Sequence, residues 1–288
     1  MDVSQGIIFG IIAMLGWGAS DVFIAQSARG AGTLRAFLWS QVISVALLLL
    51  IFLEYYSVPV ISARMLGIVA LAGFFGVIAN LAFFKSLEVG KVSITMPVAS
   101  CWAVVVVFLG IYFLGEKLTA LQAYGVFFAI AGAVLVSFKL EDIRKMKMNL
   151  ASLARGVKYA AIAALAYGLS FVLIDMVVSE VGWFLSIFFI EIAMVFYLIV
   201  YSGYRKKNIS FPDNVSTPIL IVVVLDTAAY LAYGAGVASE YGSIVAPIGA
   251  ASPAVGILMA RIFFKERLQA NHKIGIVAVL AGLVMLAV

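Results

Sequence analysis

Two carboxylate side chains lie in the middle of long apolar segments. Glu191 lies near the centre of residues 182–203, and Asp226 near the centre of residues 217–238. An ionisable group in an apolar environment is costly, so each is a functional candidate. Burial favours the neutral form, which lets a carboxyl group exchange a proton, whereas the ionised form can bind an amine. We regard both as candidates for solute binding and proton coupling; the alternative is a structural role in hydrogen bonds between helices.

Aromatic and polar side chains recur at helical spacing around these acids. Asp226, Tyr230 and Tyr233 share one face of a helix, and Trp17 and Asp21 are four residues apart. The predicted cavity residues are Trp17, Asp21, Asn80, Tyr167, Glu191, Asp226, Tyr230 and Tyr233. Rings would suit an apolar or aromatic solute and could hold a cationic group by their faces. The alternative is that these rings pack helices together.

The composition indicates where such side chains are held. Of 288 residues, 65% are hydrophobic and 11% charged, and the mean hydropathy is +1.17. Soluble domains carry about 25% charged residues, so this chain is predicted to be a membrane protein. The single Cys101 and single His272 exclude a disulfide within the chain and a multi-histidine metal site. We therefore expect no metal and no cofactor.

Ten apolar segments have about the 20 residues needed to cross a bilayer as helices. They are 5–27, 35–53, 66–87, 92–113, 120–138, 155–178, 182–203, 217–238, 243–264 and 271–288. The two halves match at an offset of 150 residues without a gap, which pairs Pro97 with Pro247 and Glu116 with Glu266. We predict an all-α integral membrane protein of ten transmembrane helices, built from two five-helix repeats. Five spans is an odd number, so the repeats would have inverted topology.

The predicted domains are a first repeat at 1–138, a basic linker at 139–154 and a second repeat at 155–288. Most arginines and lysines fall on the side of the linker. The positive-inside rule therefore puts the linker in the cytoplasm, with both termini outside, in a prokaryotic inner membrane. The net charge of +5 then sets orientation, and we expect no nucleic-acid partner.

Two further pairs of residues are predicted to shape the helices. Pro97 and Pro247 each remove one helical hydrogen bond, which would bend the fourth span of each half. Glu116 and Glu266 lie between the fourth and fifth spans, where a carboxylate can cap the free N–H groups at the start of a helix. We interpret both glutamates as structural corners, with a role in opposing gates as the alternative.

These features together resemble a known family. Each half has Pro97 or Pro247 early in its fourth span, then FLGEKL (113–118) or FFKERL (263–268), then two glycines seven residues apart. This pattern resembles the EamA-type members of the drug/metabolite transporter superfamily, although Lys265 replaces the motif's glycine in the second half. The resemblance implies a secondary transporter of a small organic solute, often one that exports an amino acid or related metabolite, and the inverted repeat is typical of transport by alternating access. The expected partners are the solute, the lipid bilayer and, if the two central carboxyl groups couple transport to a proton gradient, protons; transport without coupling is the alternative.

Other functions fit the sequence less well. Among transporters, the alternative is multidrug efflux of lipophilic or aromatic cations. An intramembrane enzyme is disfavoured because the spans contain no neighbouring pair of aspartates to hold magnesium, and the chain has no glycine-rich phosphate loop followed by a lysine. A receptor or scaffold would have little use for the symmetric repeat.

Overall fold

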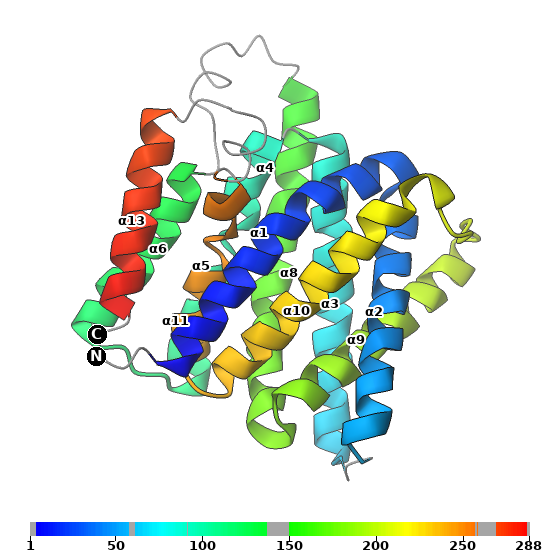
Figure 1. The fold of residues 1–288 in the computed structure, drawn as a ribbon, viewed down its shortest axis with the longest axis horizontal. Helices are drawn as coiled ribbons and strands as arrows, with labels where there is room; N and C mark the ends of the chain where they lie inside the picture. Colours follow the sequence, from blue (N-terminus) through cyan, green and yellow to red (C-terminus); the bar gives the residue numbers. More distant parts are fainter. Residues whose placement is uncertain are drawn as a thin grey trace.

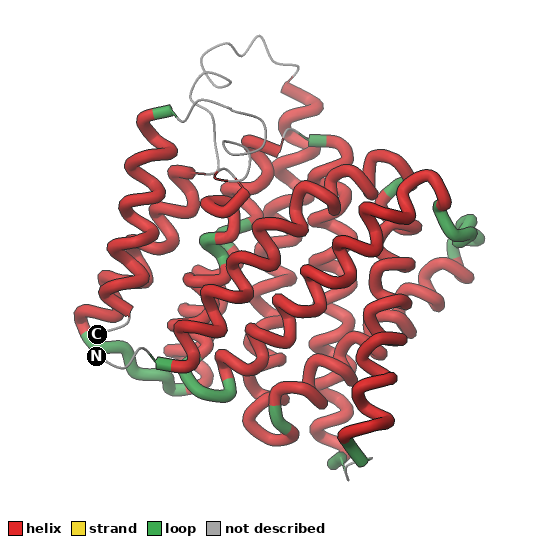
Figure 2. The backbone as a smooth tube through the Cα atoms, in the orientation of Figure 1, coloured by secondary structure: helices red, strands yellow, loops and turns green. Residues whose placement is uncertain are grey.

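The computed structural model describes residues 4–57, 61–90, 92–136, 150–256, 258 and 269–286. Within these ranges the chain forms helices joined by turns, without a strand (Figure 2). The all-α class is therefore confirmed. The linker residues 139–149 and Glu266 lie outside the described ranges.

Each half contains the same succession of helices. The first half comprises α1 (Gln5–Ala31), α2 (Thr33–Tyr55), α3 (Ala63–Val89), α4 (Val92–Ala99), α5 (Trp102–Leu109), the π-helical turn η1 (Gly110–Leu114) and α6 (Ala120–Val136). The second comprises α8 (Leu150–Val181), α9 (Trp183–Tyr204), the short 3₁₀ turn η2 (Asp213–Val215), α10 (Ser216–Val237), α11 (Gly242–Gly249) and α13 (Ala270–Leu286). Helix α8 begins at Leu150, so it already includes the last residues of the predicted linker.

The helix boundaries keep the 150-residue offset seen in the sequence. Helices α4 and α11 begin and end 150 residues apart, and so do α6 and α13. Gly32 joins α1 to α2 and Gly182 joins α8 to α9, and both have φ of 82°. Glycine adopts this left-handed conformation without steric cost, which explains the residue at both corners.

Six helices are long and apolar enough to cross a membrane, namely α1, α2, α3, α8, α9 and α10. Shorter apolar helices cover Trp102–Leu114, Ala120–Val136, Gly242–Gly256 and Ala270–Leu286. The protein is therefore a multi-pass membrane protein, although four of the ten predicted spans are shorter in the described ranges than 18 residues.

The predicted fourth and ninth spans are broken rather than continuous. Helix α4 ends at Ala99 and α5 begins at Trp102; likewise α11 ends at Gly249 and the helix resumes at Ser252. Each break is a tightened turn: Cys101 N–H donates to the carbonyl three residues back, and Ala251 N–H does the same. Each helix ends two residues after its proline, so the expected bend at Pro97 and Pro247 is in fact an interruption that follows them.

The helices pair across the two halves. Helix α1 packs along α10, α3 along α8, and α6 along α13. In Figure 1, α1 rises from the end of the molecule where the N-terminus is marked, whereas α8 descends toward that end. A Cβ atom on Gly132 of α6 would lie 2.7 Å from the carbonyl oxygen of Gly275 in α13. Glycine therefore allows the close backbone approach that holds helices together in lipid.

Candidate functional site

Six of the eight predicted cavity residues line one cavity between the two halves. They are Trp17 and Asp21 on α1, Asn80 on α3, Tyr167 on α8, and Asp226 and Tyr230 on α10. We call this space the central cavity. Its volume is about 60 Å³, which is room for a few water molecules. Each half contributes three of these six side chains.

The indole ring of Trp17 is the centre of the cavity's aromatic wall. Its centroid lies 5.4 Å from that of Tyr230, 5.6 Å from Phe171 and 6.0 Å from Trp102, each in an edge-to-face arrangement. Phe171 in turn stacks on Trp102 with centroids 4.4 Å apart. Such pairs stabilise the packing beyond simple area burial, which makes this wall a rigid surface for a ligand.

The polar side of the central cavity is acidic. Ser20 Oγ donates a hydrogen bond of 3.3 Å to Asp226 Oδ1. The carboxyl groups of Asp226 and Asp21 are close enough to repel each other when both are ionised. The Tyr167 hydroxyl donates to Asn80 Oδ1 at 2.8 Å, which fixes the orientation of that amide. The lining residues that the structure describes include two carboxyl groups and no lysine, arginine or histidine. Two acids beside ring faces can hold a positively charged group.

Glu191 and Tyr233 do not line the central cavity. Glu191 is 3% exposed and accepts a hydrogen bond of 2.5 Å from Ser44 Oγ, whose oxygen also lies 2.7 Å from that of Thr227. It thus ties α9 to α2 and α10. Tyr233 is fully buried, and its hydroxyl donates to Asp175 Oδ1 at 3.3 Å.

Several cavity residues on the broken helices were not predicted from the sequence. They include Met96, Ala99 and Ser100 before α5, and Ser252 after the break that follows α11. Trp102 also lines the cavity as the first residue of α5. Hydropathy gives no sign of the breaks that turn these residues inward, so no clear sequence signal distinguished them. Among the described residues, no group of three metal-ligating side chains occurs.

Glu116 caps a helix, but not the one that follows it in sequence. Its carboxylate accepts hydrogen bonds from the backbone N–H groups of Gly242 at 3.2 Å and Ser243 at 3.0 Å. These are the first two residues of α11, in the opposite half of the chain. The expected cap at the start of the fifth span is therefore corrected: Glu116 connects the two halves.

Comparison with known proteins agrees with this architecture. A solved crystal structure superposes with a TM-score of 0.77 over 99% of this chain and 98% of its own, at 17% sequence identity, so the two share a fold. An uncharacterized protein of Methanocaldococcus jannaschii is 28% identical over 135 residues. That match covers 47% of this chain and 98% of the relative, which is thus about as long as one half. The EamA-like transporter family matches residues 4–138 and again residues 154–288, so the chain belongs to the EamA-like transporter family, with one copy in each half.

Proposed function

We propose that the protein is a secondary transporter that moves a small organic solute through the central cavity. The observation that carries this proposal is that both halves of the chain line the cavity: α1 and α3 of the first half, and α8 and α10 of the second. A site at the meeting of two repeats can be opened to either side by rocking one repeat against the other. The broken helices beside the cavity support the same function, because interrupted helices are typical of transporter binding sites.

Alternating access would follow from an inverted arrangement of the ten predicted spans. Helices α1 and α8 occupy equivalent places in the two repeats and run in opposite directions in Figure 1, which supports inversion. The resulting pseudo-symmetry gives the protein two similar conformations, one open to each side. We place the basic linker at 139–154 in the cytoplasm, as the positive-inside rule indicates, and we propose a prokaryotic inner membrane.

The solute we propose carries a protonated amine, as an amino acid or a related metabolite does, and export is the proposed direction. Asp21 and Asp226 would bind the amine, and the amide of Asn80 and the hydroxyl of Tyr230 would bind the solute's polar groups. The small volume of about 60 Å³ favours a compact solute. A larger one would need the cavity to expand as the repeats move.

Efflux of lipophilic or aromatic cations is the second candidate. The rings of Trp17, Trp102 and Phe171 support it, because ring faces attract organic cations and the nearby carboxyl groups would add to that attraction. The two candidates differ in breadth: an amine metabolite carrier would accept a narrow chemical series, whereas a multidrug transporter would accept many unrelated cations.

Proton coupling would involve Asp226 and Glu191. Asp226 lines the central cavity together with Asp21, Tyr167 and Tyr230. Glu191 is connected to the same region by hydrogen bonds, because its partner Ser44 contacts Thr227, the residue next to Asp226. Loss of a proton from either acid would leave a charge in an apolar interior, which binding of an amine would offset.

Transport into proteoliposomes tests the proposal. Purified protein should give saturable flux of an amine solute that depends on the pH gradient, and Asp226→Asn should abolish that flux. Asp213→Asn is the matched control, because Asp213 is exposed and lies outside the cavity. Flux that survives in Asp226→Asn would overturn the binding role. Unchanged pH dependence in both Asp226→Asn and Glu191→Gln would overturn proton coupling.

A further inference from the structure

A larger cavity lies away from the central one, between the ends of α2, α3 and α9 and the side of α8. Its volume is about 670 Å³, within the usual range of ligand-binding pockets. We call it the lateral cavity. It shares no lining residue with the central cavity, so it has no part in the proposed solute site.

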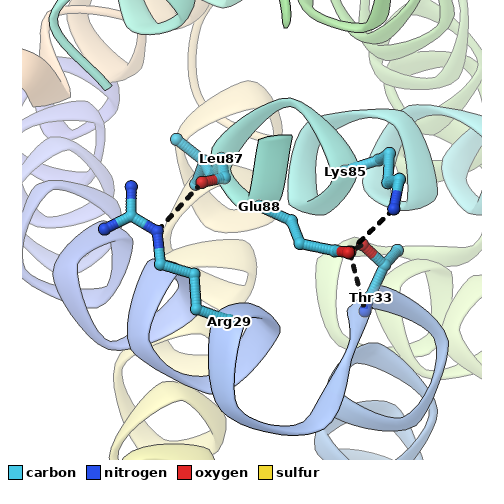
Figure 3. A network of polar contacts seen from close by, with 5 residues as sticks. All are labelled: Arg29, Thr33, Lys85, Leu87 and Glu88. Atoms are coloured by element: carbon cyan, nitrogen blue, oxygen red, sulfur yellow. Dashed lines mark hydrogen bonds and ion pairs between the residues drawn. The ribbon is translucent and has the colours of Figure 1, made fainter. Parts of the chain in front are cut away.

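One end of the lateral cavity is basic. Arg35, Lys85 and Lys207 line it, against the single carboxylate of Glu88. That carboxylate is already engaged: it accepts hydrogen bonds from the Thr33 N–H at 3.2 Å and the Thr33 hydroxyl at 2.5 Å, and it pairs with Lys85 at 2.8 Å (Figure 3). The basic end therefore keeps a net positive charge.

Backbone contacts hold this basic end in place. Arg35 Nε donates a hydrogen bond of 3.1 Å to the Ser210 carbonyl, which anchors the guanidinium to the segment after α9. In the last turn of α1, Arg29 Nε donates to the Leu87 carbonyl at 3.3 Å, which fastens α1 to the last turn of α3 (Figure 3). The cationic groups thus project from a fixed corner where several helices end. Helix ends of a membrane protein lie at the level of the lipid headgroups.

The other end of the lateral cavity is apolar. Ile78 and Leu81 of α3 and Ile162 of α8 line it. Ile78 precedes Lys85 by two helical turns, which places it about 10 Å deeper along α3. Tyr159 and Tyr201 line the same cavity, and tyrosine is typical of the boundary between headgroups and hydrocarbon.

We propose that the lateral cavity binds one anionic phospholipid. Its phosphate contacts Arg35, Lys85 and Lys207, and an acyl chain lies along Ile78, Leu81 and Ile162. Basic pockets between transmembrane helices select anionic headgroups, because each cation near the membrane surface adds attraction. A small soluble anion would satisfy the basic end but leave the apolar end without a partner. The proposal does not depend on which solute is transported.

Lipid titration of the purified protein tests the site. Binding of palmitoyl-oleoyl phosphatidylglycerol, measured in detergent by native mass spectrometry and by the shift in melting temperature, should exceed that of the phosphatidylcholine with the same chains. The double variant Arg35→Gln with Lys207→Gln should weaken phosphatidylglycerol binding by about 10- to 30-fold. The matched control is Arg205→Gln with Lys206→Gln, which removes the same charge from exposed residues outside the cavity and should leave binding unchanged.

Three outcomes would overturn the proposal. They are equal binding of both lipids, equal loss in the two double variants, and competition by glycerol 3-phosphate as effective as that by the whole lipid. The last would make the cavity a site for a soluble anion. If the Arg35 change prevents folding, Lys207→Gln alone decides the matter, since this exposed side chain should contribute about fivefold.

Discussion

The Tyr233 hydroxyl donates a hydrogen bond of 3.3 Å to Asp175 Oδ1, and this contact lies between two cavities. On α8, Phe171 lines the central cavity, and Asp175, one turn later, lines a second cavity of about 400 Å³. On α10, Tyr230 lines the central cavity and Val237 the second, with Tyr233 between them. We infer that the ring of Tyr233, which is fully buried, is the closure that separates the two cavities.

Replacing Tyr233 by phenylalanine should make this closure easier to open. The ring that packs 4.6 Å from Phe171 is kept, but the hydrogen bond to Asp175 is lost. A hydrogen bond of this kind contributes about 0.5–1.5 kcal/mol, so opening should become roughly 2- to 10-fold more frequent. The measurement is the rate at which an impermeant maleimide, added from the side of the second cavity, labels a cysteine placed at Ser252 after Cys101→Ser.

Tyr241→Phe is the control for the closure. Tyr241 lines the second cavity and is 44% exposed, so its hydroxyl does not separate the cavities. Labelling should match that of the parent protein in this variant. Faster labelling in Tyr241→Phe, or an unchanged rate in Tyr233→Phe, would show that the Tyr233 contact does not limit access.

Trp17→Leu should weaken binding of a cationic solute while the protein still folds. Leucine keeps an apolar side chain but removes the ring face, whose attraction for a desolvated cation is about 2 kcal/mol. The dissociation constant should therefore rise about 30-fold, as measured by calorimetric titration in detergent. Trp39→Leu is the control, because Trp39 packs on Phe211 and donates to the Ile209 carbonyl, away from the central cavity. Equal losses in both variants would argue for general destabilisation.

The sequence predicted the order of the helices because apolar length and internal repetition are encoded locally. Pro97 and Pro247 keep register over 150 residues, and the helices that contain them begin and end at the same offset. The breaks after these helices could not be predicted, because Ser100 and Cys101 are too short a stretch to change the hydropathy. The conformation of both breaks depends on tertiary packing. At the break after α11, for example, a Cβ atom on Gly249 would lie 2.7 Å from the ring of Trp17.

The sequence gives the depth of a side chain in a membrane better than its direction. Glu191 and Asp226 were predicted as equivalent mid-depth acids, yet only Asp226 lines the central cavity. Helices that are apolar on all sides lack the polar stripe that identifies the inward face of a soluble helix. The direction of Glu191 is set by Ser44 and Thr227, which lie on two other helices. Such partners cannot be identified from spacing along one helix.

Gly168→Val should destabilise the protein by about 1–3 kcal/mol, the usual cost of overpacking. A Cβ atom at Gly168 would collide with Val105 and lie 3.2 Å from the Trp102 carbonyl oxygen, so α8 could not stay against α5. Gly67→Val is the matched control, since Gly67 is also helical and has no atom within 4 Å of its Cβ position. In thermal melting measured in detergent, the melting temperature of Gly168→Val should be well below that of Gly67→Val. Similar midpoints would contradict the close packing of α8 on α5.

Glu116→Gln should loosen the start of α11 and lower the stability of the protein by about 1–2 kcal/mol. Glutamine has one oxygen to accept from the Gly242 and Ser243 N–H groups, and it loses the charge that favours a helix N-terminus. Hydrogen exchange should therefore become faster at these two amides than in the parent protein, with little change along α13. Glu54→Gln, an exposed change at the end of α2, removes the same charge without touching a cap. If hydrogen exchange at the amides of Gly242 and Ser243 were equally slow in both variants, the Glu116 carboxylate would not hold the two halves together. The duplicated glutamate would then need another explanation.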